Sequence, residues 1–134
     1  SAFLTIPKAI EFLKQHNWPE VAKTCRDIVK KNALRFCELV GSQPLCPITD
    51  EFLGQMFSIP ITTPEPEKLQ RHLYTKYKIE IPVMRHADKT YLRYSINAFN
   101  SQQDLDTLYN AVKEIMETTD LITYPEGKPA AKKF

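Results

Sequence analysis

The chain has 134 residues, 43% of them hydrophobic, which is enough for one domain with a single core and too few for two domains of ordinary size. Its 18 basic and 16 acidic residues nearly balance, which argues against a nucleic-acid or anionic-membrane partner. It has no apolar run of membrane-spanning length and no signal-peptide pattern at its start, so we expect a cytoplasmic protein.

Two helices are predicted at the beginning of the chain. The apolar residues of the first, over residues 1–16, recur at helical spacing and are Phe3, Ile6, Ile10 and Leu13. The second is predicted to begin after Asn17, with Glu20 three residues later as in a capping box. Gly41 is expected to end it, because glycine readily adopts the left-handed conformation that closes a helix.

A strand is predicted over Met56–Ile61, and Pro60 places that strand at a sheet edge or strand end, because proline donates no ladder hydrogen bond. A third helix is predicted to start near Pro66. Alternating apolar residues then predict two strands, over 79–83 and 91–97, which a polar turn joins as a hairpin.

The last predicted helix begins at Ser101, with Asp104 three residues on, and is amphipathic. From Thr118 the periodicity ends, so we expect a domain over 1–117 and a flexible tail over 118–134. The order helix, helix, strand, helix, strand, strand, helix predicts an α+β fold. Its small, mainly antiparallel sheet is expected to be covered by helices on one face.

Arg93 is the best candidate for a functional residue. It alternates with apolar neighbours, so a strand over 91–97 would direct Arg93, Ser95 and Asn97 to a polar face. A guanidinium matches a carboxylate with two parallel hydrogen bonds, which makes a carboxylate ligand its natural partner. Periodicity alone favours a surface or salt-bridged arginine, because that is the commoner role of an arginine in a strand.

Three segments of the chain resemble one enzyme family. The run from Leu92 to Asn100 resembles the C-terminal end of class V pyridoxal-phosphate aminotransferases, which have fold type I. Within that family it most resembles the isopenicillin N epimerase-like group, which is related to the cysteine desulfurases. Residues 1–13 resemble the helix that leaves the family's cofactor-binding large domain, and residues 80–82 resemble the short strand before its arginine hairpin. The resemblance implies a C-terminal small domain, with residues 1–16 leading from the missing large domain.

The resemblance also implies roles for single residues. Arg93 matches the arginine that binds the substrate's α-carboxylate, and His86 lies where an active-site neighbour is expected, although a solvated turn residue has the same pattern. Ser95 and Asn97 are candidates to hold the Arg93 side chain, with plain strand surface as the alternative. Asn100 matches a recurrent family position, and we favour a local role for it in capping or in the turn.

The groups that hold pyridoxal phosphate lie upstream of this region in the family: a Schiff-base lysine, an acidic partner for the ring nitrogen and donors to the phosphate. We therefore expect the cofactor in a full-length parent enzyme, with no catalytic residue, bound cofactor or activity in this chain alone. Lys89 belongs to a turn and is not that lysine. The implied partners are an amino-acid substrate, the missing large domain and, in the parent, a second subunit. The exposed first helix should make the chain alone self-associate.

The three cysteines, Cys25, Cys37 and Cys46, show no metal-ligand spacing, so we expect reduced structural thiols and no metal site. A desulfurase would need a mobile cysteine near the hairpin, and residues 83–90 contain none. Desulfurization is therefore the weaker candidate, while epimerase, transaminase and lyase chemistries stay open.

The alternative to an enzyme fragment is a free-standing α+β binding module without catalysis. Ser1 is followed at once by an apolar segment, as expected of a chain that begins within a longer protein. An expression remnant or a processed start gives the same pattern.

Overall fold

A computed structural model of the chain describes residues 2–126. Its elements are the 3-10 helix η1 (Ala2–Thr5), α1 (Ile6–Gln15), α2 (Trp18–Val40), β1 (Met56–Ile61), α3 (Pro66–Tyr77), β2 (Val83–His86), β3 (Lys89–Ser95) and α4 (Gln102–Thr118). This confirms the predicted α+β class and element order. Among these described helices, none has both the length and the apolar character that crossing a bilayer requires.

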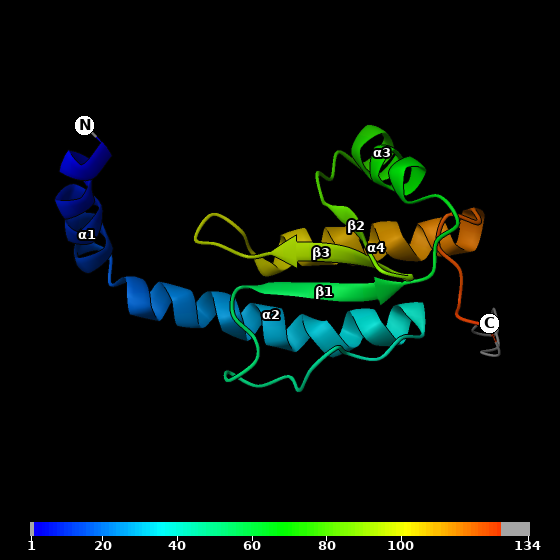
Figure 1. Cartoon of the computed structure of the whole chain (residues 1–134), viewed down its shortest axis with the longest axis horizontal. Helices are drawn as coiled ribbons and strands as arrows, with labels where there is room; N and C mark the ends of the chain where they lie inside the picture. Colours follow the sequence, from blue (N-terminus) through cyan, green and yellow to red (C-terminus); the bar gives the residue numbers. More distant parts are fainter. Residues whose placement is uncertain (1, 127–134) are drawn as a thin grey trace.

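The sheet has three strands in the order β1-β3-β2, and both pairs are antiparallel (Figure 1). The strand predicted over Met56–Ile61 is confirmed as β1, and it lies at an edge of this sheet, as Pro60 indicated. Phe57 and Ile59 of β1 are buried and pair with Tyr94 and Leu92 of β3. The apolar residues of the two strands therefore line the same face of the sheet.

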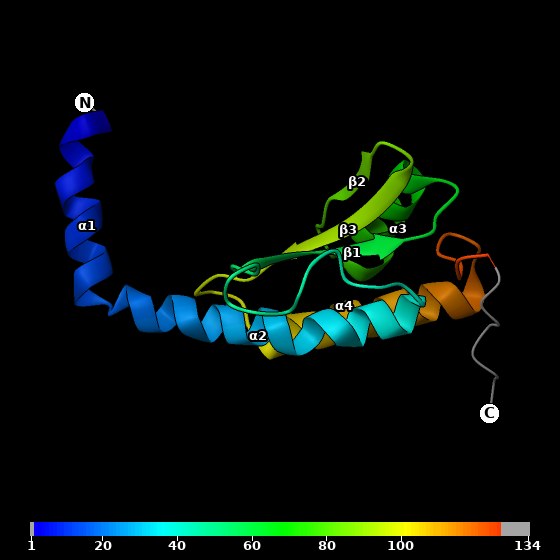
Figure 2. The same cartoon turned by 60° about the horizontal axis from the view of Figure 1, so that its bottom comes forward.

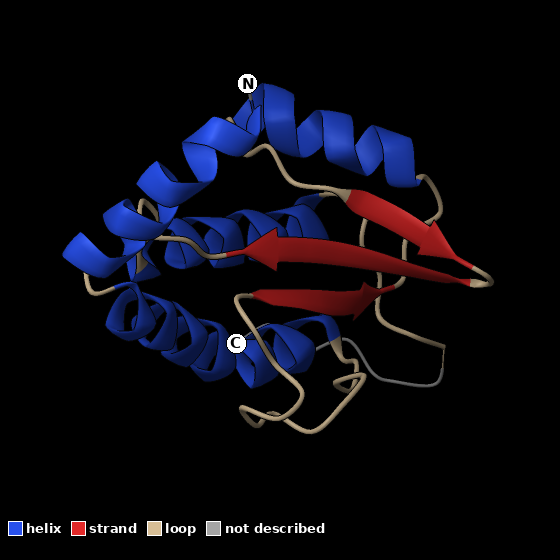
Figure 3. Cartoon of the chain, turned by 60° about the vertical axis from the view of Figure 1, so that its left-hand side comes forward, coloured by secondary structure: helices blue, strands red, loops and turns tan. Residues whose placement is uncertain are grey.

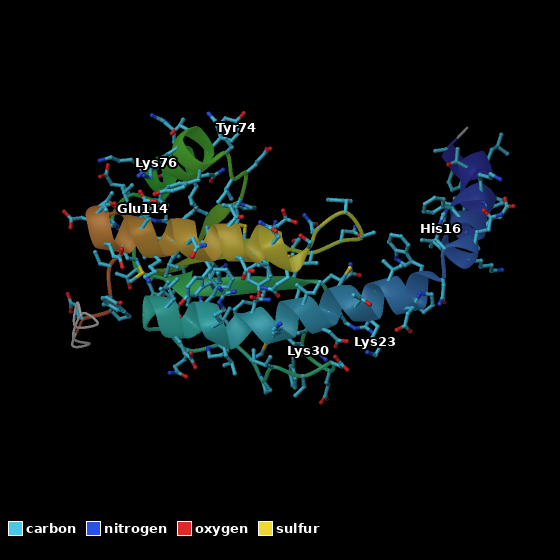
Figure 4. The ribbon with its side chains drawn as sticks, turned by 180° about the vertical axis from the view of Figure 1, so that it is seen from behind. His16, Lys23, Lys30, Tyr74, Lys76 and Glu114 are labelled. Atoms are coloured by element: carbon cyan, nitrogen blue, oxygen red, sulfur yellow. The ribbon has the colours of Figure 1, made fainter. Side chains whose placement is uncertain are left out.

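Helices α2 and α4 lie side by side against that face (Figures 1 and 2). The Tyr94 hydroxyl donates to the Val29 carbonyl at 3.0 Å and so links β3 directly to α2. Helix α3 buries Leu69 and Leu73, and its Lys76 pairs with Glu114 of α4 at 2.7 Å (Figure 4). The opposite face has no described helix over it, and Figure 3 shows the three strands with nothing in front of them.

Two of the three helix caps that the sequence predicts are confirmed by the structure. Gly41 ends α2 in the left-handed region at φ 72°, and the side chain of Asp104 accepts the Ser101 N–H at 2.7 Å in a capping box. Helix α2 begins directly after Asn17, as predicted, but the expected cap is wrong, because the Asn17 side chain makes no capping bond. Asn17 instead adopts φ 47° and turns the chain between α1 and α2.

The strand predicted over 79–83 is wrong in its bounds. Residue Lys78 closes α3 in the left-handed region, and the Ile79 N–H bonds back to the Leu73 carbonyl. Pro82 has no N–H to donate, so the pairing there is limited to its carbonyl, which accepts from the Arg93 N–H at 3.2 Å. The regular pairing of β2 begins at Val83, and the expected polar turn is shortened to residues 87–88.

The described part of the expected flexible tail packs on the body. Leu121 and Ile122 are buried in the core, and Thr123 forms an antiparallel bridge with Thr62. The start of a flexible tail at residue 118 is therefore wrong, because two apolar side chains after α4 join the hydrophobic core. Residues 127–134 of that prediction lie outside the described residues.

Candidate functional site

Arg93 lies in the middle of β3, the central strand, on the uncovered face of the sheet. Its neighbours Leu92 and Tyr94 are buried on the other face, so the predicted alternation is confirmed. Ser58 of β1 lies directly opposite Arg93, and Pro82 contacts it from the other side through its backbone. The sheet thus holds the backbone of Arg93 between two neighbouring segments.

The side chain of Arg93 is half-buried and has no hydrogen-bond or ion-pair partner among residues 2–126. Its Nε atom is buried from solvent and makes no hydrogen bond, and no acidic residue of the described chain forms an ion pair with its guanidinium. Leaving a buried charged donor unpaired is costly, and such groups in folded proteins call for an explanation. A salt-bridged arginine, one of the alternatives from the sequence, is therefore absent among the residues that the structure describes.

Ser58 is the residue that sequence reasoning missed. Directly opposed residues in an antiparallel pair have Cβ atoms about 4.5–5.5 Å apart, so its half-buried hydroxyl lies on the same face as Arg93 and next to it. The available signal was its polar character between the two apolar residues Phe57 and Ile59. Arg93 and Ser58 together offer a cation and a hydroxyl to one ligand.

The two residues expected to hold Arg93 make no hydrogen bond to it in the described structure. Ser95 is exposed on the same face, two residues along β3. Asn97 lies beyond the end of β3, and its side-chain oxygen accepts the Ala98 N–H at 2.8 Å. The Asn100 side chain accepts the Asn97 N–H at 3.0 Å, which is the local turn role that we favoured for it.

His86 and Lys89 lie at the tip of the hairpin, away from Arg93. They pair with each other across the turn, and four residues of extended strand, roughly 13 Å, separate Lys89 from Arg93. His86 is exposed there and shares the uncovered face with Arg93 without being adjacent to it. The hairpin by itself does not bring His86 to the guanidinium.

The described residues do not form a pyridoxal phosphate site by themselves. Lys89 is the one lysine that the three strands direct to the uncovered face, and it lies at the far end of that face. It lines a hollow of about 280 Å³ with Asp88 and Ser42, and Arg93 is not among the residues that line this hollow. No step of a reaction can be assigned to such a cofactor from these residues.

The three cysteines are free thiols in the part of the chain that the structure describes. Cys25 and Cys37 are buried, and burial raises the pKa of Cys37. Cys46 lies in the loop between α2 and β1, where it is half-buried and packs against the hydrophobic core. Within residues 2–126, no cluster of histidine, cysteine or acidic side chains has the arrangement of a metal site.

Comparison with known proteins gives one informative similarity. No known protein-family model matches the chain. Isopenicillin N epimerase from Amycolatopsis lactamdurans is 26% identical to it over 115 residues, which cover 84% of this chain and 29% of that protein. The chain thus spans about three tenths of the length of the curated relative that it matches. This similarity supports a relationship to class V aminotransferase-like proteins, the group that the sequence resemblance indicated.

Proposed function

We propose that this chain is the C-terminal small domain of a longer pyridoxal-phosphate-dependent enzyme, in which Arg93 binds the α-carboxylate of an amino-acid substrate. The observation that carries the proposal is the half-buried Arg93 guanidinium, whose Nε is buried and unpaired on the uncovered face of the sheet. The similarity to an epimerase more than three times as long as the matched region supports the enzyme class.

The physical argument concerns the geometry of the guanidinium. Arginine offers its N–H groups as a rigid, permanently charged fork that matches the two oxygens of a carboxylate. Because Arg93 has no acidic partner among the described residues, a ligand carboxylate would not have to displace one. The Ser58 hydroxyl, on the adjacent strand, is suited to accept or donate a hydrogen bond to the same ligand.

In this proposal the chain binds and orients the substrate, and the preceding region of the longer enzyme supplies the cofactor site and the acid-base groups. Pyridoxal phosphate, when bound there, withdraws electrons from the substrate's α-carbon and so permits proton removal. Arg93 would fix the carboxylate and hence the orientation of the α-carbon. Epimerization, transamination and elimination differ in acid-base groups outside this chain. The chain alone would therefore be inactive in any of them.

Replacing Arg93 tests the proposal in the longer polypeptide. Arg93→Ala is expected to reduce kcat/KM for the amino acid by about 2–4 kcal/mol in transition-state free energy, and to leave the absorbance of the bound cofactor unchanged. Arg93→Lys should recover part of the loss, because lysine keeps the charge and loses the fork. The matched control is Arg85→Ala on β2, an exposed arginine that pairs with Thr90 and faces the other side of the sheet.

A second substrate makes the test specific for the carboxylate. An amine that lacks the carboxylate should be a poor substrate of the unchanged enzyme, and Arg93→Ala should affect it little. If the variant lost activity equally toward both compounds, Arg93 would have a structural role instead. Unchanged kinetics with the amino acid would show that Arg93 does not bind the substrate carboxylate. The free-standing binding module would then be the better-supported function.

A further inference from the structure

A strip of apolar side chains crosses the uncovered face of the sheet beside Arg93. Tyr91 lies on β3 two residues before Arg93, so the two side chains share that face. Pro60 of β1 and Met84 of β2 pair with Tyr91 from either side, and directly opposed residues direct their side chains to the same face. Pro60, Tyr91 and Met84 together form the apolar row.

The hydrophobic core does not use the apolar row. All members of the row are half-buried, yet within residues 2–126 none of them belongs to the core or to the side chains packed against it. That core lies on the other face of the sheet, where Leu92 and Tyr94 are buried. No described helix covers the row (Figure 3). Its apolar surface is therefore available to a ligand bound on this face.

The apolar row lies within reach of a substrate that Arg93 holds. Two residues of antiparallel strand, about 6.8 Å, separate Tyr91 from Arg93 along β3. An amino-acid side chain of about four carbons, with bonds of about 1.5 Å, extends a similar distance from its carboxylate. With the carboxylate on Arg93, such a side chain can lie over the Tyr91 ring and the Met84 thioether. Methionine adapts readily to apolar ligands, because its side chain is flexible and polarizable.

The opposite direction along β3 offers a different surface. Ser95 lies two residues after Arg93 and is exposed. Its partner on β1 is Met56, which is 47% exposed at the start of that strand. The half-buried apolar surface next to Arg93 is therefore on the side of Tyr91.

The charges of the sheet disfavour a cationic side chain on the substrate. The three strands contain no acidic residue. Besides Arg93, they direct Lys89 and the titratable His86 to this face, both at the hairpin tip. Asp88 lies in the turn at that tip. The apolar row would remove water from a cationic group without offering it a carboxylate, and unpaired burial of a charge is costly.

We propose that the apolar row is the subsite for the substrate's side chain, and that the substrate is an amino acid with an apolar side chain of about four carbons or more. Tyr91 and Met84 contact this side chain while Arg93 holds the carboxylate. The inference rests on the proposed function, because it starts from a carboxylate bound by Arg93. It adds the chemical class of the side chain, which the proposed function leaves open.

Titration of the longer, cofactor-loaded enzyme with alanine, norleucine and lysine tests the side-chain class. The absorbance of the bound cofactor reports the binding of each amino acid and gives its dissociation constant without requiring turnover. Norleucine should bind at least tenfold more tightly than alanine, because each additional buried methylene contributes about fourfold in affinity. Lysine, which is norleucine with a terminal ammonium group, should bind no more tightly than alanine. An absence of norleucine binding, or binding of lysine as tight as that of norleucine, would overturn the apolar class.

Substitution of Met84 tests the position of the subsite. Met84→Ala should lower the preference for norleucine over alanine by about fivefold. Met84→Gln should lower it as well without opening a cavity, because glutamine keeps the length of the side chain and makes its end polar. Met84→Leu should keep the preference.

The matched control is Met56→Ala, since Met56 is a methionine on the same face, diagonal to Arg93 on the side away from Met84. This variant should leave the preference for norleucine unchanged. An equal loss of preference in Met56→Ala and Met84→Ala, or an unchanged preference in Met84→Ala, would overturn the assignment of the apolar row.

Arg93→Ala separates a failure of this inference from a failure of the proposed function. It should weaken the binding of alanine and norleucine by the same factor and leave the preference between them unchanged. If that result holds while Met84→Ala changes nothing, Arg93 binds the carboxylate and the apolar row is not the side-chain subsite. If Arg93→Ala leaves both dissociation constants unchanged, the proposed carboxylate site itself is wrong.

Discussion

Two adjacent glutamines at the start of α4 show how strongly the role of a side chain depends on its contacts. Gln102 exchanges two hydrogen bonds, at 2.8 and 3.0 Å, with Asn32 of α2, whose exposed fraction is 1%. Arg35 completes the cluster by donating to Asn32 at 3.1 Å and pairing with Asp106. Gln103, one residue on, is exposed. The polar cluster therefore links the two long helices at one defined position.

We predict that Gln102→Ala lowers the free energy of unfolding by about 1–3 kcal/mol, because it removes two hydrogen bonds from the buried amide of Asn32, which then keeps those to the Ile28 carbonyl and from Arg35. The control Gln103→Ala should stay within about 0.5 kcal/mol of the unchanged chain. Urea unfolding of the two variants measures both values. If the two variants were equally stable, the Asn32 side chain would have to replace the lost hydrogen bonds with other partners.

At the scale of single elements, helix ends determine where the chain changes direction. Gly41 closes α2 at φ 72°, a conformation that costs little for glycine and strains a residue with a Cβ atom. The Ser42 N–H then bonds to the Cys37 carbonyl at 2.8 Å, which completes the cap. The loop that leads to β1 starts from this point, so the cap also orients the edge strand.

We expect Gly41→Ala to destabilise the protein by about 1 kcal/mol. The control Gly54→Ala should be neutral or slightly stabilising, because Gly54 has no positive φ and a Cβ there meets no atom within 4 Å. Denaturant midpoints compare the two alanine variants directly. A cap role for Gly41 would be rejected by equal midpoints for both.

At the scale of the whole molecule, Tyr94 joins the two layers. Its ring packs between Phe36 of α2 and Phe57 of β1, with ring centroids 5.4 and 5.9 Å away, and its hydroxyl donates to the Val29 carbonyl. Burial raises the pKa of this hydroxyl above its ordinary value near 10. The folded protein therefore holds the Tyr94 proton more tightly than the unfolded chain does.

This difference sets the direction of a pH dependence. Below pH 10 both states are protonated at Tyr94 and its stabilising effect is complete; above pH 10 the unfolded chain ionises first, so stability falls as pH rises. Tyr94→Phe should lose about 1 kcal/mol at pH 8 and show a smaller further loss at pH 10.5 than the unchanged chain. Tyr91→Phe, on the uncovered face, is the control. The same alkaline loss in both variants would contradict the assignment.

The order of elements could be predicted from the sequence, because helix and strand periodicities depend on near neighbours. The bounds of β1, the cap at Gly41 and the capping box at Ser101 all follow from a few adjacent residues. The predicted strand over 79–83 was wrong in its bounds, because the closing turn of α3 and the missing N–H of Pro82 delay the pairing until Val83.

What the sequence by itself determined is the class of the fold and the face on which Arg93 lies. Three features depended on the tertiary structure: the absence of an acidic partner for Arg93 among the described residues, the position of Ser58 beside it, and the separation of α1 from the body. Each depends on where residues distant in the chain meet. Periodicity shows which side of an element is apolar, whereas only the packed structure shows what covers that side.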